Sequence, residues 1–220
     1  MPSQLITIKN KIALLNKKRK SYKLPSIKFY PPLAEKTIIA FEKKHSIIIP
    51  EDYRQFLLHI GNGQRGNSPF YAYFHLNTLK NALHYVVTLK KILPNFLSTP
   101  FPFTNTITKK IIYSIEKENN YCPLFAHLYD SCPEREIPGY LCLSDTGECD
   151  VFYGLIVTGE QREKMWKAGE GNYPLYKKEK NKIIQHTFFS WYEEWLDKHL
   201  ENSTLQEIHS RYKEWGKLLK

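Results

Sequence analysis

Hydrophobic positions near the N-terminus recur at helical spacing. Apolar side chains between Leu5 and Leu15 form a short amphipathic pattern, which favours packing on a domain over insertion into lipid. A second helix is predicted over Leu33 to His45, after two prolines. A third begins at Pro50-Glu51-Asp52, because proline and two carboxylates suit the first turn of a helix, and it ends at Gly61-Asn62-Gly63.

The middle of the chain changes to an alternating pattern. One more helix is predicted from Leu79 to Leu93, and the prolines that follow mark an irregular segment. Short runs rich in aromatic and β-branched residues indicate strands joined by turns, for which antiparallel pairing is the simplest topology. These runs are Phe70–Phe74, Leu124–Leu128, Gly139–Leu143, Val151–Val157 and Lys164–Lys167.

Two helices are predicted at the C-terminal end. Thr187 is suited to cap a helix that continues through Leu200, in which Trp191 and Trp195 lie four residues apart on one stripe. Core packing explains this stripe better than ligand binding does. The last helix is predicted over Ser203 to Leu219.

Composition indicates a folded protein whose positive charge is concentrated at one end. The chain has 220 residues and a formal net charge of +10. Its apolar fraction of 42% is too high for a disordered chain. Residues 1–44 hold eleven Lys and Arg against two Glu, whereas residues 45–170 hold twelve basic and thirteen acidic residues. A basic arm at the N-terminal end could bind the phosphate groups of a nucleic acid. A solvated surface helix is the better interpretation of this arm, because few aromatic residues lie near it to stack on bases. This arm comprises Lys17, Lys18, Arg19 and Lys20.

The sequence contains no signal for export or membrane insertion. No apolar run approaches the roughly 20 residues of a membrane-spanning helix. Residues 1–10 have no apolar stretch followed by a small-residue cleavage site. We therefore expect a cytoplasmic protein with no membrane partner.

The cysteines and histidines do not fit a metal or redox site. The four cysteines are Cys122, Cys132, Cys142 and Cys149. They contain no C-x-x-C pair, and the eight histidines form no H-E-x-x-H motif, so we expect reduced thiols, no metal and no cofactor. A nucleophilic role for Cys149 would need a base, for which His127 or His186 are the candidates, and the residues give this role little support. We expect a protein that is not an enzyme.

Three blocks of the sequence, taken in order, resemble the SMI1/KNR4 family, also called the SUKH superfamily. The first block runs from Ile49 to Leu57 and into Gly61-Asn62-Gly63. The second runs from Gly139 to Asp150 and continues through Val151-Phe152-Tyr153 and Leu155 to Gly159, with Trp166 downstream. The third, Thr187 to Asp197, is similar to the family's C-terminal helix.

This resemblance implies an α+β fold, with N-terminal helices, a central bent antiparallel sheet and C-terminal helices packed on it. We expect the family-like domain to cover residues 31–201. A basic N-terminal extension (1–30) and a helical C-terminal extension (202–220) would flank it, because the minimal domain of the family has neither. Many bacterial members look like immunity proteins, which bind and neutralise a cognate toxin, often a nuclease of a polymorphic or contact-dependent system.

One acidic segment has the residues best suited to a nuclease partner. A protein that blocks a nuclease presents carboxylates to a surface built for phosphate. Residues 134–150 carry five acidic side chains against Arg135 alone, and aromatic residues beside them could anchor a contact. The candidate partner-binding residues are therefore Glu134, Glu136, Asp145, Glu148, Asp150, Tyr140, Phe152 and Tyr153. A solvated hairpin rim is the alternative interpretation.

The sequence therefore predicts a non-enzymatic protein that neutralises a cognate protein toxin by occluding it. One alternative is a nucleic-acid-binding or regulatory scaffold module that uses the basic arm. Another is that the basic surface meets an acidic partner, in which case the toxin is not a nuclease. An enzyme with an unrecognised site is the least supported alternative.

Overall fold

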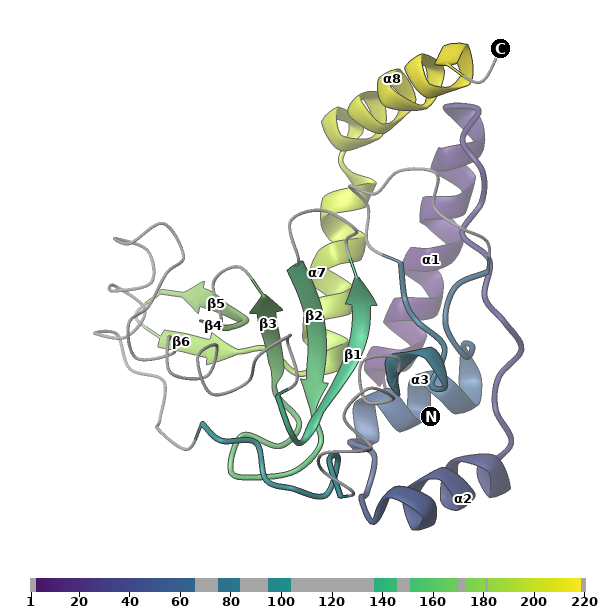
Figure 1. The fold of residues 1–220 in the computed structure, drawn as a ribbon. Coiled ribbons are helices and arrows are strands. Elements are labelled where there is room, and N and C mark those ends of the chain that lie inside the picture. Colours follow the sequence, from purple (N-terminus) through teal and green to yellow (C-terminus); the bar gives the residue numbers. More distant parts are fainter. Residues whose placement is uncertain are drawn as a thin grey trace.

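The computed structural model describes residues 3–65, 75–83, 95–103, 137–145, 151–169, 173–180 and 182–218. Over these residues the chain is an α+β protein, as predicted, with helices at both ends and antiparallel strands between them (Figure 1). The strands expected at Phe70–Phe74 and Leu124–Leu128 lie outside the described residues. So does most of the helix expected at Leu79–Leu93, whose described part contains the short 3-10 helix η1 (Asn81–Leu83).

Among the described residues, three α-helices precede the sheet: α1 (Ser3–Ser21), α2 (Glu35–His45) and α3 (Glu51–His59). The expected positions of α2 and α3 are confirmed, and Pro50 is the N-cap residue of α3. α1 extends past the amphipathic pattern because the basic arm continues the helix. In the described part of the chain no helix, α1 included, is long and apolar enough to cross a membrane.

Antiparallel strands form two sheets. The strands are β1 (Tyr140–Asp145), β2 (Val151–Ile156), β3 (Met165–Gly169), β4 (Tyr173–Pro174), β5 (Tyr176–Glu179) and β6 (Lys182–Gln185). The first four pair in the order β1-β2-β3-β4, and β5 pairs with β6 in a hairpin that the sequence pattern did not predict. Alternate residues of β1 enter two hydrophobic clusters: Leu141 and Leu143 join one, and Tyr140 and Cys142 join the other, around Trp166. The sheet is therefore buried on both faces.

Two helices follow the strands: α7 (Phe188–Leu200), whose N-cap residue is Thr187 as predicted, and α8 (Asn202–Leu218). α7 packs against the sheet, where the rings of Trp191 and Tyr153 lie 5.8 Å apart between centroids. It also contacts α1 and α3 (Figure 1). α7 is thus the central helix of the protein.

The two terminal segments belong to the main hydrophobic cluster. Their buried residues are Leu5, Ile8, Leu15, Leu24, Leu205 and Ile208. Lys11 also ties α1 to α7, because its Nζ lies 2.8 Å from Glu193 and 2.6 Å from Asp197. The described parts of residues 1–30 and 202–220, which the sequence sets apart as extensions, therefore share one core with the rest of the described chain.

Candidate functional site

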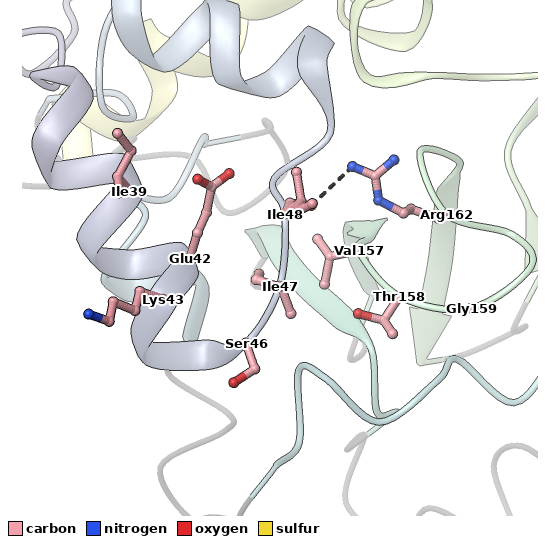
Figure 2. Close-up of a pocket in the computed structure, with 10 residues that line it drawn as sticks. All are labelled: Ile39, Glu42, Lys43, Ser46, Ile47, Ile48, Val157, Thr158, Gly159 and Arg162. Atoms are coloured by element: carbon pink, nitrogen blue, oxygen red, sulfur yellow. Dashed lines mark hydrogen bonds between the residues drawn. The ribbon is translucent and has the colours of Figure 1, made fainter.

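An open groove lies between α2 and the connection from β2 to β3, with the loop after α2 between these two walls (Figure 2). Its volume is about 550 Å³. The lining residues are Ile39, Glu42, Lys43, Ser46, Ile47, Ile48, Val157, Thr158, Gly159 and Arg162. Ile48 is 69% exposed and Ile39 is 51% exposed, the two highest values among the large hydrophobic residues that the structure describes.

The backbone after α2 forces Ile48 into solvent. α2 ends at Ser46, whose φ of 52° turns the chain sharply. In an extended chain neighbouring side chains point to opposite sides. Ile47 and Ile49 are buried, and Ile48 between them therefore faces outward. The Nη2 of Arg162 donates a hydrogen bond to the Ile48 carbonyl at 3.1 Å, which holds this arrangement across the groove (Figure 2).

A partly buried cluster of one arginine and two carboxylates supports the α2 wall. Arg54 of α3 donates from Nη1 to Glu42 at 2.6 Å and from Nη2 to Glu35. Burial lowers the pKa of Arg54, but its hydrogen bonds to the two carboxylates outweigh this and raise the pKa above its ordinary value. Glu42 also accepts a hydrogen bond from the backbone N–H of Ile49 at 2.8 Å. Both carboxylates of α2 are thus held by the fold, and Lys43 is the exposed charge of α2 in the lining.

The opposite wall is anchored by the segment 95–103. The Thr158 hydroxyl donates to the Leu97 carbonyl at 2.7 Å, and the Phe101 N–H donates to the Thr158 carbonyl at 2.9 Å. Gly159 follows with a φ of +104°, and a Cβ there would lie 2.9 Å from the Phe101 nitrogen, so glycine is required. Because both walls are fixed by internal bonds, the groove is preformed.

Most of the acidic candidates fall outside the described residues. Glu134, Glu136, Glu148 and Asp150 are among these undescribed residues. Asp145 is the last residue of β1. Tyr140 and Phe152 are buried in the cluster around Trp166, so their rings pack the core and offer no surface to a partner in this structure. Tyr153 is partly buried against α7.

The basic arm forms the last turns of α1 and is partly used by the fold. The Nζ of Lys18 donates to the Leu200 carbonyl at 2.7 Å, at the end of α7 where a cation is favoured. The Nε of Arg19 donates to the Pro25 carbonyl at 2.6 Å. Lys17 and Lys20 are exposed. The four side chains therefore do not act as one free cationic arm.

His186 lies in a polar cluster at the start of α7. Its Nδ1 is 3.0 Å from the Ser190 hydroxyl, and its Nε2 is 3.1 Å from a Glu194 carboxylate oxygen. Burial lowers the pKa of His186, and the Glu194 charge opposes this effect. The Ser190 hydroxyl also accepts a hydrogen bond from the Thr187 N–H at 3.0 Å, so the cluster fixes the first turn of the helix. Cys149, the nucleophile for which His186 was considered as a base, lies outside the described residues.

The described residues hold no group of three or more His, Cys, Asp or Glu that could bind a metal ion.

Sequence reasoning missed the groove residues Ile39, Ile48 and Arg162. The run from Ser46 to Pro50 holds three consecutive isoleucines, so no alternation of apolar and polar residues marks the middle one as exposed. Arg162 is 114 residues from Ile48 in the sequence, and no local pattern connects them. No family model matches the chain, and no curated protein matches its sequence.

Proposed function

We propose that this protein is a non-enzymatic protein-binding domain that neutralises a cognate protein toxin by occluding it, with the groove beside α2 as its contact surface. The observation that carries the proposal is the exposure of Ile48 and Ile39, both of which line one preformed groove. Contiguous exposed apolar surface rimmed by charge is typical of a protein interaction site.

The energy available from these two side chains is substantial. Full burial of an isoleucine is worth roughly 1.5–3 kcal/mol, so covering the exposed parts of Ile39 and Ile48 contributes about 1–2 kcal/mol each. Each contribution corresponds to roughly a tenfold change in affinity. The preformed groove adds to this effect, because little conformational freedom is lost on binding.

The class of partner is supported by the resemblance to the SMI1/KNR4 family. The first of the three family-like blocks begins at Ile49, directly after the exposed Ile48, and continues through α3. Arg54, within this block, holds the carboxylates of the α2 wall. The first block therefore supports the α2 wall of the groove, and immunity proteins of the family supply the toxin-neutralising role.

A growth assay with matched variants tests the proposal. The full chain is co-expressed with each candidate toxin encoded by a neighbouring gene, and growth is measured. We expect rescue by the wild type and by the control Ile6→Ser/Leu14→Ser, whose two positions are exposed on α1 outside the groove lining. Ile39→Ser/Ile48→Ser should fail to rescue. Failure of the wild type to neutralise any toxin would refute the toxin-neutralising role. Equal rescue by both double variants would refute the groove as the contact surface for the toxin.

A further inference from the structure

We propose that the groove binds an acidic segment of the partner protein, in which an apolar side chain lies between carboxylates. This inference rests on the proposed function and specifies the chemistry of the partner's contact surface. It follows from the lysines on the exposed face of α2, from the internal pairing of the α2 carboxylates, and from the guanidinium across the groove.

The exposed face of α2 carries lysines on either side of an apolar centre. Lys36, Ile39, Ala40 and Lys43 recur at helical spacing, so they share one face, and all four are exposed. At a rise of about 1.5 Å per residue, the two lysines are about 10 Å apart along the helix. Ile39, which lines the groove, lies between them.

The carboxylates of α2 compensate these lysines only in part. Glu35 and Glu42 are the acidic residues of the helix, and both are paired with Arg54. Within the described ranges, neither Lys36 nor Lys43 forms an ion pair. The outer face of α2 is therefore positive for a reason that is independent of the basic arm.

Arg162 places a further cation beside Ile48, on the side opposite Lys43. Figure 2 shows Lys43 and Arg162 on opposite sides of Ile48. Nη2 of Arg162 donates to the Ile48 carbonyl and Nη1 pairs with Glu163, whereas Nε has no hydrogen-bond partner among the residues described. A guanidinium keeps further N–H donors for a carboxylate, which it recognises with good geometry.

An apolar anchor between two cations selects a complementary ligand. Burial of Ile48 and Ile39 supplies affinity, while the cations favour acidic partners and disfavour basic ones. Because the two lysines are exposed and Arg162 is partly exposed, binding should weaken as salt rises. A basic phosphate-binding surface of a nuclease does not fit this groove, so the partner contributes an acidic surface instead.

Two synthetic peptides of 15 residues serve as probes. They share the same leucine positions, and the flanking charged positions are all Glu in one and all Lys in the other. Binding to the full chain is measured by fluorescence anisotropy at low and high salt. We compare the wild type with Lys36→Glu/Lys43→Glu and with Lys17→Glu/Lys20→Glu, a control that changes the same charge on exposed residues of α1. Circular dichroism confirms that each variant is folded.

We expect the acidic peptide to bind the wild type and the α1 control with similar affinity and to bind Lys36→Glu/Lys43→Glu at least tenfold more weakly. Ile39→Ser/Ile48→Ser should also weaken it, and the lysine peptide should bind the wild type poorly. Equal losses of affinity in both charge variants would show that the acidic peptide responds to the net charge of the protein and not to the groove, which would overturn the proposal. Equal binding of both peptides, or binding of neither, would overturn it as well.

Light scattering after size exclusion identifies a competing occupant. A wild-type dimer that becomes a monomer in Ile39→Ser/Ile48→Ser would show that a second copy fills the groove, which overturns the proposal. The growth assay separates this inference from the proposed function. Rescue that needs Ile48 but tolerates Lys36→Glu/Lys43→Glu retains the toxin-neutralising role and rejects the acidic ligand. Selective peptide binding without rescue of any toxin retains the ligand chemistry and rejects the toxin-neutralising role.

Discussion

Replacement of Leu15 by alanine tests whether α1 is part of the folded core. Leu15 is 0% exposed and its neighbour Leu14 is 48% exposed, so the same substitution at adjacent positions of one helix isolates the effect of burial. Leu15→Ala should lower the free energy of unfolding by about 3 kcal/mol, within the range for buried leucines that leave a cavity. Leu14→Ala should lower it by no more than about 0.5 kcal/mol, because surface substitutions have small effects.

Urea unfolding, followed by tryptophan fluorescence, measures both changes. For an m-value of about 3 kcal/mol/M, Leu15→Ala should move the unfolding midpoint down by about 1 M, and Leu14→Ala should leave it nearly unchanged. Equal small shifts for the two variants would show that α1 is a detached arm. They would also refute the assignment of Lys11 and Lys18 to contacts with α7.

Three further changes test other parts of the structure. Burial lowers the pKa of His199 to about 4 in the folded protein, whereas its ordinary pKa of 6.5 applies in the unfolded chain. As the pH falls from 6.5 towards 4, the unfolded chain therefore binds the proton first, and the free energy of unfolding decreases. At pH 5 the loss from His199 should be about 2 kcal/mol relative to pH 7, and urea midpoints of His199→Gln should show a correspondingly smaller dependence on pH. Gly154→Ala places a Cβ 2.2 Å from the Tyr140 ring and should cost about 2–3 kcal/mol; an unchanged thermal midpoint would contradict this. Arg54→Met leaves Glu42 without its ion pair and should cost about 1–3 kcal/mol, part of which Arg54→Met/Glu42→Gln should restore in thermal unfolding.

Local signals explain the elements that the sequence predicts well. The start of α3 at Pro50 and the cap of α7 at Thr187 depend on residues within one helical turn, and both are confirmed. The strands β1 and β2 follow from alternation and from the turn residues between them. In each case the interactions that decide the structure lie close together in the sequence.

Other features depend on contacts that are distant in the sequence or on atypical residues. The β5–β6 hairpin is lysine-rich, and Lys180 has a φ of 50° at its turn, a conformation that usually favours glycine. Charge counting also does not reveal that Lys18 of the basic arm bonds to the end of α7, 182 residues away in the sequence. The groove unites α2 with the β2–β3 connection, and Arg162 of that connection is 114 residues from Ile48 in the sequence.

Site-specific photo-crosslinking tests most directly whether the groove binds the partner. A photoreactive phenylalanine analogue replaces Ile48 in one preparation and Ile6, exposed on α1, in another, and each is irradiated with the toxin that the chain neutralises. The account predicts a covalent adduct with the toxin from position 48 and none from position 6. An adduct from position 6 alone, or from neither position in a complex that still forms, would contradict it.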